Sequence, residues 1–78
     1  MKILVRNLDR STTEEELKNI FQEFGAVQSC TLVVDKESKL SKGFGFVEMP
    51  KVGDAKTAIK TLNDQKIGDN KIRVKKAE

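Results

Sequence analysis

Residues 42–49 read Lys-Gly-Phe-Gly-Phe-Val-Glu-Met, and Pro50 follows them. Successive side chains of a β-strand point to opposite faces of a sheet. The inward positions of such a strand would be small or aliphatic: Gly45, Val47 and Met49. The outward positions would be charged or aromatic: Lys42, Phe44, Phe46 and Glu48. The pattern predicts a strand over residues 43–49 that ends at Pro50, because proline cannot donate to a strand ladder.

Three other short segments have the composition and alternation of strands. They are residues 2–6, 27–34 and 71–75. Their predicted inward side chains are apolar: Ile3 and Val5, then Cys30, Leu32 and Val34, then Ile72 and Val74.

Two segments between these strands have apolar residues at helical spacing. The apolar positions of the first are Leu17, Ile20, Phe21 and Phe24, and those of the second are Ala55, Ala58, Ile59 and Leu62. Thr13 and Glu16 fit a capping box at the start of the first helix. Gly25 is well placed to end it.

The predicted order of elements is βαββαβ over the whole chain of 78 residues. This order indicates an α+β fold of the ferredoxin-like kind, a four-stranded antiparallel sheet with both helices on one face. A chain of this length forms one domain, residues 1–78. The other face of the sheet is then left uncovered.

The uncovered face differs in composition from the rest of the chain. Its predicted side chains are Lys2, Leu4 and Arg6; Thr31 and Val33; Lys42, Phe44, Phe46 and Glu48; and Lys71, Arg73 and Lys75. Six of these are basic and one is acidic, whereas the whole chain has 15 basic and 12 acidic residues. Aromatic rings among cations suit a single-stranded nucleic acid, because bases stack on rings, at about 1–3 kcal/mol per base, and cations pair with phosphates.

A structural alternative places Phe44 and Phe46 in the core and leaves the surrounding charges as ordinary solvated surface. Gly45, Val47 and Met49 would then face solvent. The burial of these five residues decides between the two arrangements.

The residues that most catalytic and metal sites require are missing. The sequence has no histidine, and its single cysteine, Cys30, excludes an internal disulfide. No Ser–His pair, HExxH motif or phosphate-binding GxxxxGK[ST] motif occurs. We therefore expect a protein that is not an enzyme and has no cofactor or metal site, in which Cys30 is a small buried residue.

No apolar run approaches the roughly 20 residues that a membrane span needs. The first residues have too short an apolar stretch for a secretory signal. We expect a monomer without membrane contact, in the cytoplasm, or in the nucleus if the source is eukaryotic.

Residues 42–49 resemble the octamer motif of the RNA recognition motif family, K/R-G-F/Y-G/A-F-V-x-F/Y, at seven of eight positions. Residues 3–8, Ile-Leu-Val-Arg-Asn-Leu, resemble the hexamer motif of the family on the first strand. The order of elements and the length agree as well, so the resemblance covers essentially the whole chain. The short form of the octamer looks especially similar to that of small single-domain members found in bacteria.

The resemblance implies roles for several side chains. Phe46 would stack on one base, Phe44 would pack against sugars between two nucleotides, and Lys42 would pair with a phosphate. Leu4 stands where the family carries an aromatic residue that faces RNA, so one stacking site would be lost or weakened, by about 1–3 kcal/mol. Met49 replaces the final aromatic of the octamer at an inward position, where methionine is a tolerable core filler.

Four positions keep a second interpretation. Leu4 would either contact RNA or only shield the ring beside it. Arg6 and Arg73 would contact RNA or pair with an acid such as Glu48. Asn7 matches the Asn of the hexamer, and its alternative is a turn residue that bonds its own backbone.

The expected function is weak binding of single-stranded RNA on the open sheet face, with little sequence preference. The expected contact residues are Lys2, Leu4, Arg6, Lys42, Phe44, Phe46, Lys71, Arg73 and Lys75. Single-stranded DNA stays open as a ligand, because stacking and phosphate pairing do not distinguish it from RNA. The alternative function is a protein-interaction module on the same scaffold; Val33 beside Leu4 favours it, and the retained aromatic pair argues against it.

Overall fold

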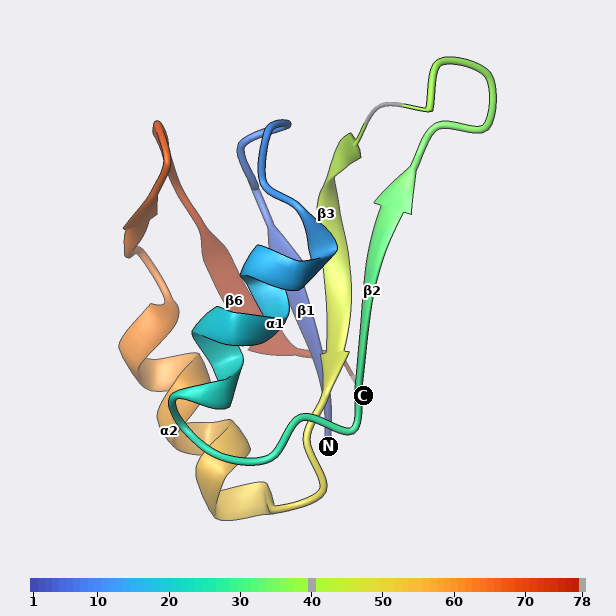
Figure 1. Ribbon diagram of the computed structural model, residues 1–78. Coiled ribbons are helices and arrows are strands. Elements are labelled where there is room, and N and C mark those ends of the chain that lie inside the picture. The colour runs from blue at the N-terminus through green and yellow to red at the C-terminus, as the bar shows by residue number, and fades with distance from the viewer. Residues whose placement is uncertain (40, 78) are drawn as a thin grey trace.

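The computed structural model describes residues 1–39 and 41–77 and places them in two helices and six strands (Figure 1). In chain order the elements are β1 (Lys2–Arg6), α1 (Glu14–Gln22), β2 (Ser29–Val34), β3 (Ser41–Glu48), α2 (Val52–Leu62), β4 (Lys66–Ile67), β5 (Asn70–Lys71) and β6 (Arg73–Lys76). The predicted βαββαβ frame is confirmed, and a short hairpin of β4 and β5 is added to it.

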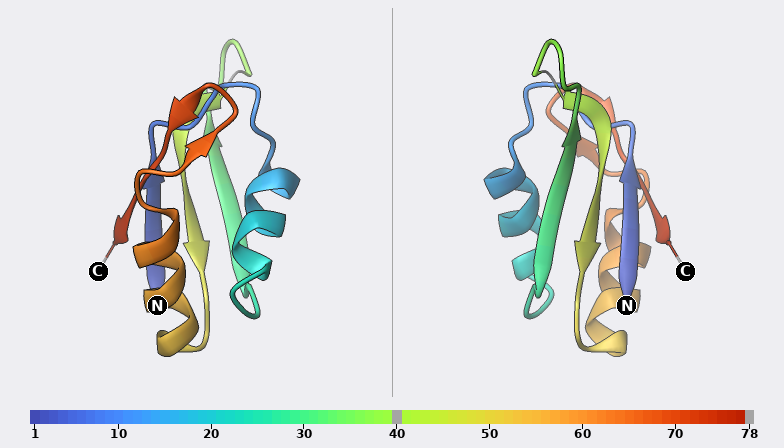
Figure 2. Two further views of the ribbon diagram at one scale, coloured as in Figure 1. Left: turned by 90° about the vertical axis from the view of Figure 1, so that its left-hand side faces the viewer. Right: turned by 90° about the vertical axis from the view of Figure 1, so that its right-hand side faces the viewer.

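Four strands form one antiparallel sheet in the order β2-β3-β1-β6. Figure 1 shows both helices in front of this sheet, and Figure 2 shows the same layers from two sides. No described element covers the opposite face of the sheet. This arrangement is the ferredoxin-like fold that the order of elements predicts.

The core lies between the sheet and the helices. Apart from Thr12, the residues with fully or almost fully buried side chains are apolar: Ile3, Val5, Leu8, Leu17, Phe21, Val47, Met49, Ala55, Ala58, Leu62, Ile72 and Val74. Gly45 is buried as well, whereas Phe44 and Phe46 are half-buried on the other face. The alternative that placed the two Phe side chains in the core is therefore wrong.

The first helix begins where the capping box predicts. The Thr13 hydroxyl accepts a hydrogen bond from the Glu16 backbone N–H at 3.1 Å and donates one to a Glu16 carboxylate oxygen at 3.2 Å. The helix ends at Gln22, a little before Gly25. Phe24, which the spacing placed on the helix, packs against the core from the turn that follows.

The two helices are short, with 9 residues in α1 and 11 in α2. A helix that crosses a membrane needs about 20 residues. Within residues 1–39 and 41–77, no helix is long and apolar enough to do so.

Strand β3 has a bulge near its beginning. Leu32 of β2 pairs with Gly45, whereas Val34 pairs with Ser41, so β3 has extra residues between these pairs. Gly43 lies in this bulge at a φ of 83°, which glycine adopts without strain. The shift breaks the alternation of β2: Val34 was predicted to face the core, but its side chain is 47% exposed.

The predicted last strand, residues 71–75, is interrupted at Ile72. The Ile72 N–H donates to the Gln65 carbonyl at 2.9 Å, and the Ile72 carbonyl accepts from the Asp64 N–H at 2.8 Å. These bonds tie the chain to the segment after α2, so only β6 pairs with β1. Lys71 belongs to the β4–β5 hairpin, and its predicted place on the four-stranded sheet is wrong.

Candidate nucleic-acid interface

The open face of the sheet is built around Phe46. In the register of the strands, Phe46 lies opposite Leu4 of β1 on one side and opposite Thr31 of β2 on the other. Leu4 in turn lies opposite Lys75 of β6. A row of side chains therefore crosses the whole sheet, with an aromatic ring and an aliphatic side chain at its centre.

Phe44 and Phe46 form the apolar centre of this face. Their rings meet edge to face, with centroids 6.4 Å apart and planes at 88°. This is a favoured geometry for aromatic pairs, and it leaves ring surface open because both side chains are only half-buried. With Leu4 and Arg6 the two rings line a shallow hollow of about 340 Å³, which we call the aromatic depression.

Lys2 interacts with one of these rings. Its ammonium nitrogen lies 4.7 Å from the centroid of the Phe46 ring, which is within the range of a cation–π interaction. A base that stacks on this side of the ring would displace the ammonium group.

The two arginines of the face differ in their partners. They lie opposite each other in the sheet, but the Arg73 guanidinium forms an ion pair of 2.6 Å with Asp64. Both groups are more than half exposed, at 66% and 55%, so water screens the pair, which is worth at most about 1 kcal/mol. Arg6 makes no ion pair among the described residues. Glu48, the alternative partner in the sequence, accepts a hydrogen bond from Ser29 instead.

Asn7 connects the end of β1 to the hairpin. Its backbone has a φ of 58°, as expected of a turn residue. Its side-chain amide donates to the Lys71 carbonyl at 2.7 Å, so it does not bond its own backbone as the alternative proposed. Lys71 is thereby held near the end of the sheet, although outside it.

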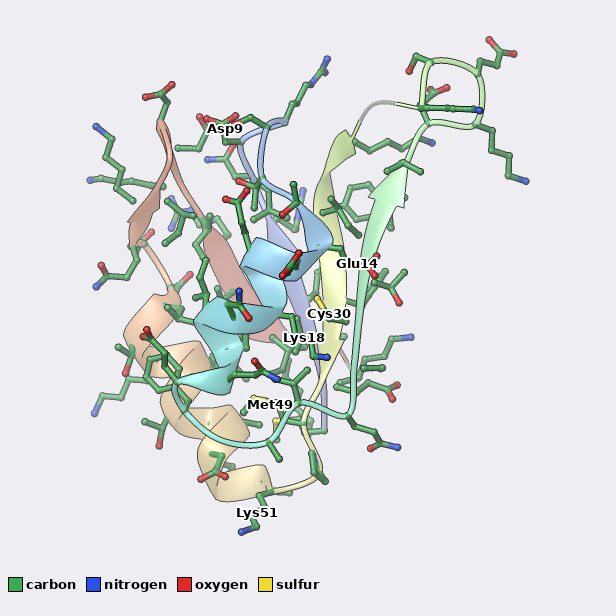
Figure 3. All side chains as sticks on the ribbon, in the orientation of Figure 1. Asp9, Glu14, Lys18, Cys30, Met49 and Lys51 are labelled. Atoms are coloured by element: carbon green, nitrogen blue, oxygen red, sulfur yellow. The ribbon has the colours of Figure 1, made fainter. Side chains whose placement is uncertain are left out.

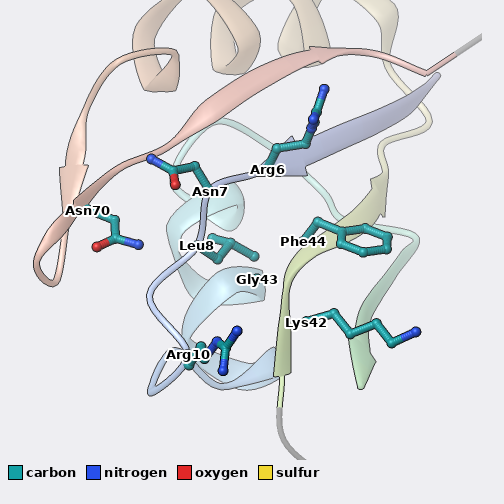
Figure 4. Close-up of a pocket in the computed structure, with 8 residues that line it drawn as sticks. All are labelled: Arg6, Asn7, Leu8, Arg10, Lys42, Gly43, Phe44 and Asn70. Atoms are coloured by element: carbon teal, nitrogen blue, oxygen red, sulfur yellow. The ribbon is translucent and has the colours of Figure 1, made fainter. Parts of the chain in front are cut away.

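A second hollow, of about 350 Å³, adjoins the aromatic depression, and we call it the loop–hairpin pocket (Figure 4). Its lining comes from the end of β1 and the loop after it, the start of β3 and the hairpin: Arg6, Asn7, Leu8, Arg10, Lys42, Gly43, Phe44 and Asn70. Alternation along the four predicted strands cannot find Arg10 or Asn70, because Arg10 lies in a loop and Asn70 lies in the β4–β5 hairpin outside those strands. The only sequence signal for them is their polar character beside turn residues.

Cys30 lies on the helix side of β2, close to α1, as Figure 3 shows. Its thiol donates a weak hydrogen bond to the Glu14 carbonyl at 3.6 Å. Burial, and then the charge of Glu14, raise the pKa of the Cys30 thiol to about 11, against a smaller opposing effect of Lys18. The thiol is therefore protonated and unreactive at neutral pH. Over the described part of the chain, no cluster of His, Cys, Asp and Glu could hold a metal ion.

A model of the RNA recognition motif family matches residues 3–73. The chain belongs to the RNA recognition motif family. The match includes every residue of the open face except Lys2 and Lys75. The resemblance that the octamer and hexamer motifs carry is thereby confirmed.

Polyadenylate-binding protein 2 of Arabidopsis thaliana is 42% identical over 76 residues, which are 97% of this RNA recognition motif and 12% of that protein. The chain spans between 8% and 28% of the length of the curated relatives reported for it, from Arabidopsis thaliana, Mus musculus and Spinacia oleracea. The likeness to small bacterial members stays a prediction.

Two solved structures show the same fold. The crystal structure of the RNA-binding protein PG1 is 44% identical, with a TM-score of 0.95, and the match covers 99% of this chain and 93% of that one. The Sxl-lethal protein/RNA complex is 27% identical, with a TM-score of 0.94, and the match covers 99% of this chain and 46% of that one. The RNA recognition motif described here therefore has a relative whose structure contains RNA.

Proposed function

We propose that this RNA recognition motif binds single-stranded RNA on the open face of its sheet. The observation that carries the proposal is the half-buried pair of Phe44 and Phe46 at the centre of a face rich in cations. Stacking of each base on such a ring contributes about 1–3 kcal/mol. The polyadenylate-binding relative and the relative that forms an RNA complex support the choice of ligand.

The aromatic and basic side chains have distinct parts in the proposed complex. Phe46 stacks on one base, Phe44 packs against the sugars of two nucleotides, and Lys42 pairs with a phosphate. Further positive charge comes from around the rings: Lys2, Arg6, Lys71, Arg73 and Lys75. Lys71 would act from the hairpin, beside the sheet rather than on it.

Binding is expected to be weak and tolerant of sequence. Leu4 lies opposite Phe46 at the centre of the sheet and has no flat ring on which a second base could stack. Stacking and phosphate pairing are also insensitive to base identity, because every base has a π face and every nucleotide has a phosphate. A second copy of the motif on a longer chain, or a partner, would raise the affinity through linked sites.

The proposal also covers the oligomeric state, the compartment and the absence of catalysis. We propose a monomeric domain of the cytoplasm that acts by binding alone, without catalysis and without a cofactor. Most side chains on the open face are cations or apolar groups, which suit binding rather than catalysis. The relatives named above favour RNA binding over the protein-interaction alternative.

The proposal is tested by NMR titration of labelled protein with a pool of short random single-stranded RNAs, and again with the matching DNAs. Phe46→Ala is expected to weaken RNA binding by about 1–3 kcal/mol, the contribution of one stacked base. The fold should be unchanged, because Phe46 lies outside the core. The affinity should also fall steeply with salt, because each phosphate contact releases condensed ions.

Thr31→Ala is the matched control, since Thr31 lies opposite Phe46 on the same face and has no ring. Shifts at Leu4, Arg6, Phe44 and Phe46 with RNA would support the proposal. Equal shifts with DNA would widen the ligand to single strands in general. Unshifted amides over the whole sheet would refute the proposal and direct attention to a peptide partner on the helices.

A further inference from the structure

The loop–hairpin pocket begins where the aromatic depression ends. Arg6 and Phe44 line both hollows, so a strand that lies over Phe44 can continue directly into the pocket. We propose that the pocket holds the phosphate and ribose of a further nucleotide, which leaves the sheet between the β1–α1 loop and the β4–β5 hairpin. This inference rests on the proposed function, because it extends the path of an RNA already bound to the sheet.

The charge of the pocket suits an anionic group. Arg6, Arg10 and Lys42 line it, and no acidic side chain does. None of these three cations has an ion pair among residues 1–39 and 41–77. Their charge is therefore available to a ligand, and guanidinium groups match the geometry of phosphate oxygens.

The nearest acid of the loop is turned to other partners. The Asp9 carboxylate accepts hydrogen bonds from the Ser11 N–H at 2.9 Å, the Ser11 hydroxyl at 2.8 Å and the Asp69 N–H at 3.2 Å. These bonds lower the pKa of Asp9, with the Ser11 backbone as the largest cause. The carboxylate is thus occupied as an acceptor within the protein and is not among the groups that line the pocket.

Three hydrogen bonds between distant segments hold the walls of the pocket. The Leu8 N–H donates to the Gly43 carbonyl at 2.8 Å and joins the loop to β3. The Asn7 amide bonds to the Lys71 carbonyl, and the Asp69 N–H bonds to the Asp9 carboxylate, so the loop is also joined to the hairpin. The pocket exists before a ligand arrives, which reduces the entropy that binding would lose.

Asn70 supplies a polar group on the hairpin side of the pocket (Figure 4). Within the described residues its side-chain amide makes no hydrogen bond, although it carries both donors and an acceptor. It can therefore bond to a phosphate oxygen or to a ribose hydroxyl. Arg10 comes from the loop and Lys42 from β3, so the polar residues of the lining come from three separate segments (Figure 4).

The test compares Arg10→Gln with Lys60→Gln, which removes an exposed cation of α2 that does not line the pocket. Each protein is titrated with oligouridylates that increase from dinucleotide to hexanucleotide. In the wild type and in Lys60→Gln, the addition of one nucleotide at one point in the length series should raise the affinity about three- to tenfold, as expected of a single net hydrogen bond. Arg10→Gln should not show this gain in affinity. Its plot of log affinity against log salt should also be less steep by about 0.7. Asn70→Ala should reduce the same gain.

NMR shifts separate failure of this inference from failure of the proposed function. Two results together would support the proposal that the pocket binds a nucleotide. Phe46 should shift with every oligomer that binds, and Arg10 and Asn70 should shift only with the longer ones. Shifts at Phe46 with no response at Arg10 or Asn70, and equal affinities of the two Gln variants, would overturn the pocket and keep the sheet as the binding surface. Absence of shifts at Phe46 and in the pocket alike would overturn both.

Discussion

At the scale of single residues, the central row of the sheet contains one strong stacking group and one weak one. Phe46 offers a ring, whereas Leu4, directly opposite it in the register, offers only an aliphatic side chain. The position of Leu4 on the open face was predictable, because the alternation of side chains along a strand depends only on residues adjacent in the chain. The cation–π contact of Lys2 was not, because it depends on how a long side chain lies over the neighbouring strand.

Leu4→Phe is expected to tighten RNA binding by about 1 kcal/mol or more, since it adds a ring on which a base can stack. The change is measured by titration of a fluorescent oligonucleotide. Val33→Phe is a useful control, because Val33 is a half-buried residue of β2, away from the strand that carries Leu4. An unchanged affinity in Leu4→Phe would mean that residue 4 only shields Phe46, the second interpretation of this position.

At the scale of elements, strands β2 and β3 approach each other so closely at Gly45 that a side chain has no room. A Cβ atom at Gly45 would lie 2.6 Å from the Thr31 carbonyl oxygen and 3.3 Å from the Leu32 Cα. Both contacts are with backbone, which cannot move aside without separating the strands. The aromatic residues on either side of Gly45 depend on that close approach for their positions.

Gly45→Ala is therefore expected to destabilise the fold by about 1–3 kcal/mol, the usual range for an overpacked site, and to weaken RNA binding as well. Gly53→Ala is the matched control: no heavy atom lies within 4 Å of the new Cβ, on helix α2. There the exchange should be neutral or stabilise by up to about 1 kcal/mol, because alanine favours helix. Denaturant unfolding of both variants measures the difference, and equal stabilities would contradict the steric account.

At the scale of the whole molecule, the end of the sheet is assembled from segments that are far apart in the chain. Asp9 joins the β1–α1 loop to the hairpin through the Asp69 N–H, and its pKa is lowered, first by the Ser11 backbone and then by the Ser11 hydroxyl and Asp69. A lowered pKa means that the folded state favours the ionised carboxylate. The stabilisation is therefore complete above the ordinary value of 3.8 and is lost as the pH falls through that value and below it.

We expect the free energy of unfolding to decrease as the pH falls below about 4, and part of that decrease to disappear in Asp9→Asn. Asp35 contributes in the same direction, because the Ser38 and Glu37 N–H groups lower its pKa. Denaturant unfolding at a series of pH values, with Asp35→Asn as a second variant, measures both effects. If Asp9→Asn kept the full decrease, the hydrogen bonds that Ser11 and Asp69 donate to the carboxylate would not be a cause of the pH dependence.

The sequence by itself was sufficient for the order of elements, for most positions on the two faces of the sheet and for the resemblance to the family. Alternation over residues 42–49 places Phe44 and Phe46 outward, and the Thr13 capping box starts the first helix, because these are local interactions of neighbouring residues. The open-face contacts themselves stay predictions.

Only the tertiary structure decided what depends on the pairing of distant segments. The bulge at Gly43 leaves Val34 exposed. The backbone hydrogen bonds of Ile72 place Lys71 outside the four-stranded sheet. Arg73 forms its ion pair with Asp64 and not with Glu48. The loop–hairpin pocket also depends on distant segments, since Arg10 and Asn70 both line it although they are far apart in the chain. Strand period carries no information about such pairs, because their distance is set by how the loop and the hairpin close over the end of the sheet.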